Sequence, residues 1–350
     1  MSEIKSLTSL RGIASLYVVI LHYFNIHKDY PDGLPFYKRF IYTFIQYGYF
    51  TVDLFFILSA FVMCLAYKKY FQTKVEYTDY KFYMLKRFAR LYPLYIVFCF
   101  VYFFLFDKDT FSLLSNITLL QIPLAKNFYL IDVFWSLSAE WVLYLIFPIL
   151  FFYFNKIKNI YLNLCILLLS ITGLYCLKFL PQYAIDNFKL VNFGIPYSNN
   201  IPFGFSAILR CFCGYIIGIS LFQLLYEEHS TWLKKFLHPI FVVPICCILF
   251  IQHMHYFVIP LFVLLIASCY INNSEYKIFN SGIIYKLGLW SYSIYVCHRA
   301  VMYIVDNNLN ISPTLQNILA IVITILLSSL TYNLIEKFFN QKINQLICRK

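Results

Sequence analysis

Charged residues are scarce in this sequence. Asp, Glu, Lys and Arg make up 13% of its 350 residues, whereas a soluble domain has about 25%. The chain also lacks internal repeats, low-complexity linkers and any polar stretch long enough to form a separate soluble unit. We therefore expect one domain over residues 1–350, with no appended soluble domain.

Metal-binding and redox motifs are missing as well. The chain has eleven cysteines, but no Cys-x-x-Cys pair and no cysteine and histidine spacing typical of a metal site. Almost all of the cysteines lie within apolar runs, where cysteine packs as a small hydrophobic residue. His253 and His255 have no further ligands nearby in the sequence. We expect no metal.

Long apolar segments dominate what is present. Hydrophobic residues make up 61% of the chain and aromatic residues 21%, and the mean hydropathy is +0.69. Segments of about 15–25 apolar residues are long enough to cross a bilayer as helices. The composition predicts an all-α polytopic integral membrane protein, a bundle of about ten transmembrane helices. The expected helices cover residues 7–26, 40–66, 92–106, 133–155, 159–180, 203–226, 239–252, 256–271, 288–304 and 315–335.

The positive charges indicate the topology. The net charge of +12 arises from lysines and arginines that cluster in alternate short connections, a pattern that marks cytoplasmic loops and does not point to nucleic acid. An even number of helices then places both termini in the cytoplasm. The prediction is weakest at 239–271, where one fused helix would reverse the later topology. The connections near 107–131 and 181–201 would face outward and meet an extracytoplasmic substrate.

The first apolar segment contains two ionisable residues. Arg11 and His22 are eleven positions apart, so on a helix they share one face and lie roughly 16 Å apart along the axis. Each would cost at least ~2.5–3.5 kcal/mol in hydrocarbon, so this face should line a protein interior or a wet cavity. A neutral His22 imidazole can accept a proton from an attacking hydroxyl. The alternative is a structural histidine, hydrogen-bonded across the bundle.

Two carboxylates lie within expected spans. Asp53 needs a buried partner, for which Arg11, His22 and Arg210 are the candidates. Glu140 is expected about two helical turns below the outer membrane surface, at a depth similar to that expected for His22. It could orient the imidazole or bind a sugar hydroxyl. Trp135 and Trp141 flank Glu140 and offer apolar faces for a sugar, although an aromatic belt at the membrane interface also explains tryptophans.

Arginines precede the third expected span. Arg87 and Arg90 lie in the expected cytoplasmic loop and are three positions apart, which places them on one face if that stretch is helical. Two adjacent guanidinium groups form a phosphate clamp. Contact with lipid headgroups is the alternative. Later in the chain, Arg210 and His298 are intramembrane residues that could contact substrate, and Glu336 is expected to pair with Arg87 or Arg90.

These motifs resemble the membrane-bound acyltransferase-3 family. The resemblance rests on Arg-x10-His in the first segment, Gly48 to Phe61 in the second, Arg-x-x-Arg-x-x-Pro before the third, and Trp-Ser-Leu-Ser-x-Glu-x-x-x-Tyr-x-x-x-Pro in the fourth. Ala60 stands where the family has glycine. The element Ser-Tyr-Ser-x-Tyr-x-x-His, which ends at His298, adds to the likeness.

The resemblance implies a bacterial inner-membrane enzyme that acylates surface sugars. The donor would be cytoplasmic acyl-CoA, its phosphates held by Arg87 and Arg90. An acetyl or similar short acyl group would pass to a hydroxyl of a polysaccharide or glycolipid, with His22 as general base and Glu140 and Arg11 as further catalytic residues. The substrate-contact residues would be Asp53, Trp135, Trp141, Arg210 and His298. A lipid, an antibiotic or a peptidoglycan sugar are other possible acceptors, and a transporter or flippase of the same architecture is the alternative function.

Overall fold

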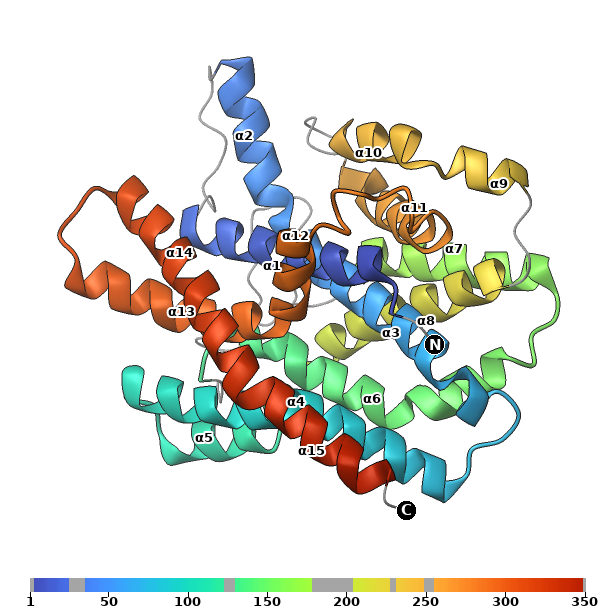
Figure 1. Cartoon of the computed structure of the whole chain (residues 1–350), viewed down its shortest axis with the longest axis horizontal. Coiled ribbons are helices and arrows are strands. Elements are labelled where there is room, and N and C mark those ends of the chain that lie inside the picture. Colours follow the sequence, from blue (N-terminus) through green and yellow to red (C-terminus); the bar gives the residue numbers. More distant parts are fainter. Residues whose placement is uncertain are drawn as a thin grey trace.

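The computed structural model describes residues 3–24, 35–122, 130–177, 204–226, 231–248 and 255–348. Within these ranges every regular element is a helix (Figure 1). The elements of the first half are α1 (Lys5–Phe24), α2 (Phe36–Gln46), η1 (Tyr47–Phe50), α3 (Thr51–Phe71), α4 (Tyr77–Leu105), α5 (Thr110–Ile117), η2 (Asp132–Phe134), α6 (Trp135–Phe154) and α7 (Ile160–Cys176). Those of the second half are α8 (Gly204–Tyr226), α9 (Thr231–Phe236), α10 (Pro239–Ile248), η4 (His255–Phe257), α11 (Val258–Ile271), α12 (Gly282–Leu289), α13 (Ser291–Asn308), α14 (Pro313–Thr331), the π-helical turn η5 (Tyr332–Glu336) and α15 (Lys337–Cys348).

The helices agree with the expected all-α membrane architecture. In the described part of the chain, six helical stretches are long and apolar enough to cross a bilayer, and α7 and α11 are apolar but shorter. The six are Lys5–Phe24, Phe40–Phe71, Tyr77–Leu105, Asp132–Phe154, Ser206–Tyr226 and Pro313–Gln345. The expected second span is divided by η1, and the last two expected spans are each built from more than one element. Within 239–271, α10 ends at Ile248 and η4 begins at His255, so most of the expected break lies outside the described residues.

Glycines bring the central helices into backbone contact. A Cβ on Gly218 of α8 would lie 2.3 Å from the carbonyl oxygen of Ile57 and 2.8 Å from the Ala60 Cβ of α3. No side chain fits in that space. The glycine that allows α3 and α8 to pack closely therefore comes from α8, which explains why α3 tolerates Ala60.

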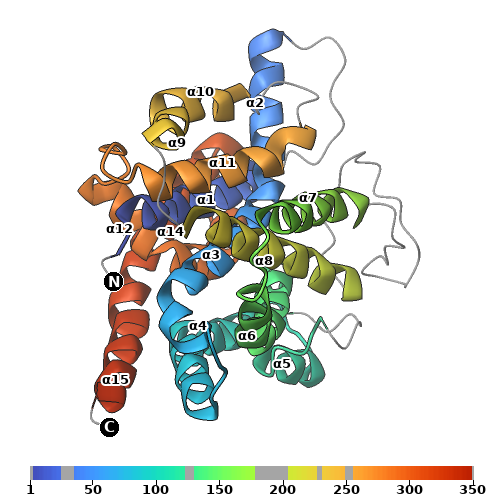
Figure 2. The same cartoon turned by 90° about the vertical axis from the view of Figure 1, so that its right-hand side faces the viewer.

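The first helix is held in the same way against α12. A Cβ on Gly288 would lie 2.1 Å from the carbonyl oxygen of Thr8, and one on Gly12 would lie 2.4 Å from the Gly288 nitrogen. These contacts fix the part of α1 that carries Arg11. Figures 1 and 2 show α1 inside the bundle, with α2 and α15 at opposite ends of the molecule.

Helix α4, which contains the third expected span, starts earlier than the sequence predicts. The stretch that contains Arg87 and Arg90 lies inside α4, which runs without interruption from Tyr77 through Pro93, so it is not a loop. The charged residues lower the hydropathy of this stretch, but they do not disfavour a helix, and no glycine interrupts it. The expected outer connection at 107–131 contains a short helix, α5, whereas 181–201 lies outside the described residues.

Candidate functional site

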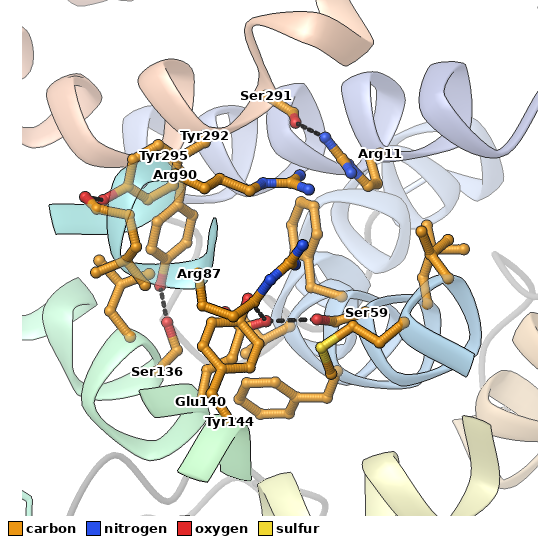
Figure 3. A pocket seen from close by; sticks show the side chains of 18 residues that line it. Arg11, Ser59, Arg87, Arg90, Ser136, Glu140, Tyr144, Ser291, Tyr292 and Tyr295 are labelled. Atoms are coloured by element: carbon orange, nitrogen blue, oxygen red, sulfur yellow. Dashed lines mark hydrogen bonds between the residues drawn. The ribbon is translucent and has the colours of Figure 1, made fainter. Parts of the chain in front are cut away.

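A cavity of about 100 Å³ lies between α1, α3, α4, α6 and α13. Three of its lining residues are the arginines that the sequence singles out, Arg11, Arg87 and Arg90, and Glu140 also lines it. Figure 3 shows the three guanidinium groups around one opening. We call this space the arginine cavity.

Arg87 is held by aromatic residues. Its Nη2 donates to the hydroxyl of Tyr67 at 2.9 Å, and its guanidinium carbon lies 5.3 Å from the ring centre of Tyr67 and 5.7 Å from that of Tyr144. Rings at this distance attract a cation through their electron-rich faces. Its Nε has no hydrogen-bond partner among the described groups. Arg87 therefore holds its guanidinium in a fixed position in the cavity wall.

Arg90 and Arg11 approach the cavity from different helices. Arg90 lies three residues after Arg87 on α4, which confirms that the two share a face of one helix. Arg11 comes from α1, and its Nη2 lies 3.5 Å from the Ser291 hydroxyl of α13. The positive charges of Arg11 and Arg90 repel each other, and the carboxylates of Glu336 and Glu3 partly offset the charge of Arg11. The helices thus hold like charges together, which an anion would stabilise.

Glu140 lies with the arginines. Its Oε1 accepts hydrogen bonds from the Ser59 hydroxyl at 2.7 Å and from the Tyr144 hydroxyl at 2.8 Å. Its depth along the fourth expected span, now α6, suggested a position beside His22. Its described hydrogen bonds are instead with Ser59 and Tyr144, which line the arginine cavity. Sequence reasoning did not single out Ser59 or Tyr144, although both lie in quoted motifs and Tyr144 is one turn after Glu140.

His22 lies against His298, at the other end of α1 from Arg11. The two ring centres are 5.3 Å apart with an angle of 32° between the planes. His298 is fully buried, and its Nδ1 is 2.7 Å from the carbonyl oxygen of Tyr295. Neither histidine lines the arginine cavity. Tyr295 does, so one turn of α13 separates the two places.

The partner of Asp53 is Arg210. The Asp53 carboxylate accepts from Arg210 Nε at 2.7 Å and from Nη2 at 2.8 Å, and both side chains are 0% exposed. Arg210 Nη2 also donates to the Tyr49 carbonyl oxygen, and the guanidinium lies 5.2 Å from the Trp135 ring centre. Of the three cations considered for Asp53, the structure selects the one on α8.

The other sequence candidates lie away from the cavity. Trp135 is buried and covered on one face by Arg210. Trp141 lines a separate groove between α4 and α6, beside Tyr80 and Phe88. Glu336 accepts a hydrogen bond from the Ser293 hydroxyl and lies near enough to Arg90 and Arg11 for their charges to attract it, without a direct ion pair to Arg87 or Arg90 among the described contacts. In the described part of the chain, no three His, Cys, Asp or Glu side chains gather as metal ligands would.

Comparison with known proteins identifies the family of the chain. Residues 4–333 match the acyltransferase domain of the acyltransferase 3 family, nearly the whole chain. No curated protein and no solved structure gives a match. The chain carries the family's domain over the same helices that build the arginine cavity and hold the two histidines, and it belongs to the acyltransferase 3 family.

Proposed function

We propose that this membrane acyltransferase takes a short acyl group, such as acetyl, from cytoplasmic acyl-CoA and transfers it to a sugar hydroxyl on the outer side of a bacterial inner membrane. The observation that carries the proposal is the convergence of Arg11, Arg87 and Arg90 on one cavity. Glu140 offsets one of these charges, which leaves the lining with a net positive charge. Such a site favours a multiply charged anion.

A phosphate of coenzyme A fits this requirement. Guanidinium groups bind phosphate through two parallel hydrogen bonds, and Arg87 and Arg90 both line the cavity. The cavity has room for a phosphate group. The rest of the donor would extend between the helices. The donor would enter the cavity from the cytoplasmic side, on which both termini are expected.

Glu140 then belongs to the donor site. Ser59 and Tyr144 hold its carboxylate at the edge of the cavity. In the empty protein this negative charge stabilises the three arginines. When the anion binds, the hydroxyls of Ser59 and Tyr144 keep the carboxylate from competing for the guanidinium groups.

His22 supplies the base. It lies eleven residues beyond Arg11 on the same helix, roughly 16 Å along the axis, so a donor anchored at the arginines would bring its thioester toward the imidazole. His22 removes the proton from the acceptor hydroxyl as the oxygen attacks the thioester carbonyl. The carbon–sulfur bond breaks, and the departing thiolate takes the proton from the imidazolium.

The test uses inverted membrane vesicles that contain the acceptor glycan and radiolabelled acetyl-CoA. Wild type should transfer label to the glycan, and His22→Ala should not at equal protein level. His238→Ala is the matched histidine control, since His238 lies between α9 and α10 and does not line the cavity. No label with wild type, together with polysaccharide precursor on the wrong side of the membrane in the null strain, would instead support a transporter.

The donor site has its own test. Loss of a hydrogen bond between charged groups costs about 1.5–3 kcal/mol, so Arg87→Ala should raise KM for acetyl-CoA by about 10–100-fold. Lys86→Ala is the control, because it removes one positive charge from the same turn of α4 without altering the cavity lining. An equal rise in KM in both variants would mean that net surface charge, and not the cavity, recruits the donor.

A further inference from the structure

His298 has one nitrogen without a partner. The residue is 0% exposed, and its Nε2 makes no hydrogen bond with any described group. A buried polar atom normally has a partner, because leaving it unpaired costs its desolvation energy. Two rings of α1 lie beside His298, that of His22 with ring centres 5.3 Å apart and that of Tyr23 at 6.4 Å, and of these only His22 carries ring nitrogens.

The hydrogen bond at Nδ1 fixes the tautomer of His298. Nδ1 lies 2.7 Å from the Tyr295 carbonyl oxygen, which can only accept, so Nδ1 carries the proton. In a neutral imidazole the other nitrogen is then an acceptor. The Nε2 of His298 is therefore a buried lone pair.

The backbone of His298 is also held in place. The Tyr23 hydroxyl donates to the His298 carbonyl oxygen at 2.8 Å and lies 2.6 Å from the Thr324 hydroxyl. These contacts join α1, α13 and α14 around the histidine pair. His298 is thus oriented by the fold before any substrate binds.

We propose that His298 is a positioning residue for His22, in place of the substrate contact expected from the sequence. Its Nε2 accepts the N–H of His22, so that the other nitrogen of His22 faces the acceptor hydroxyl as a base. The inference rests on the proposed function of His22. When His22 takes the acceptor's proton, both of its nitrogens carry hydrogen, and one N–H stays bonded to His298. No proton moves to His298.

The separation of the rings allows this contact. With ring centres 5.3 Å apart, two nitrogens that point at each other along the line of centres come to about 3 Å, an ordinary hydrogen-bond length. His22 must rotate for the contact to form, since His298 is fixed at Nδ1 and at its backbone. In catalytic triads, a third group likewise orients the base that activates the nucleophile.

The test compares His298→Leu with His298→Gln, whose amide oxygen restores an acceptor. Apparent kcat and KM for radiolabelled acetyl-CoA are measured in vesicles that contain the glycan, and unfolding is followed in detergent. His298→Leu should lower kcat about 10–100-fold, as loss of an orienting partner does, with KM within about twofold. His298→Gln should recover most of the loss. Adding His298→Leu to His22→Ala should change nothing further.

Three results would overturn the inference. The first is an unchanged kcat in folded His298→Leu. The second is an equal loss of kcat in His298→Leu and His298→Gln, with lowered melting temperatures in both. The third is a rise in KM at constant kcat in His298→Leu. The second indicates a structural role and the third a substrate contact. Activity retained by His22→Ala would be a different failure, since it removes His22 as the base and overturns the proposed function together with this inference.

Discussion

Breaking the buried ion pair between Asp53 and Arg210 should strongly destabilise the bundle. Both side chains are 0% exposed and share two hydrogen bonds of 2.7 and 2.8 Å. Asp53→Asn keeps the shape of the side chain but leaves the guanidinium charge buried without its counter-ion. Removal of one partner from a buried pair costs about 3–5 kcal/mol. For a large domain, this corresponds to a fall in melting temperature of about 6–10 °C.

A double variant distinguishes a structural role of the ion pair from a role in substrate contact. Asp53→Leu combined with Arg210→Met removes both charges together, and such replacements are often neutral or stabilising. We expect the double variant to recover most of the melting temperature in a thermal unfolding assay of detergent-solubilised protein. If the pair is structural, activity per folded molecule should return as well.

Two outcomes would refute this reasoning. A melting temperature for Asp53→Asn within about 2 °C of wild type would mean that the buried guanidinium finds another counter-ion, at a cost near or below 1 kcal/mol. A stable but inactive double variant would show that Asp53 or Arg210 contacts substrate, as the sequence suggested. The assay thus separates the two roles.

Three further predictions concern single contacts. Gly288→Ala should lower the melting temperature by an amount equivalent to about 1–3 kcal/mol or more, because its Cβ would lie 2.1 Å from backbone of α1. Tyr144→Phe should raise KM for acetyl-CoA by about 10-fold, since it removes one hydrogen bond to a charged carboxylate, worth about 1.5 kcal/mol or more, and frees Glu140 to compete for the arginines. Asp109→Ala removes the cap of α5 and should cost about 1 kcal/mol. Hydrogen bonds from Ser112 lower the pKa of Asp109. The stability that the Asp109 cap contributes is therefore present above the ordinary carboxyl pKa and should be lost as pH falls through the lowered value. Thermal unfolding of wild type and Asp109→Ala across a pH series measures the difference.

Local spacing predicted part of the site. Arg87 and Arg90 share a helix face because residues three apart are neighbours on any helix, so their convergence follows from sequence alone. The start of α4 did not, since hydropathy identifies the apolar part of a helix and misses the charged turns before it. The span at Tyr77–Leu105 begins well before its apolar run.

Pairing between distant helices was beyond the sequence. Asp53 had three candidate cations, and only the packing of α3 against α8, which Gly218 allows, places Arg210 within reach. Glu140 shows the same limit. Its depth along a helix was estimated from the motif, but the direction in which it faces depends on how α6 is rotated in the bundle, and this rotation turns it toward Ser59.

The position of α1 couples the two parts of the proposed mechanism. The Arg11 end is fixed by backbone contact with α12 through Gly12 and Gly288, whereas the His22 end is fixed by α13 through His298. A displacement caused at one end is transmitted along a rigid helix to the other. Loss of the α12 contact should therefore disturb donor binding and base position together, whereas loss of the imidazole at 298 should alter the base alone. A rise in KM with Gly288→Ala and a constant KM with His298→Leu would separate the two supports of one helix.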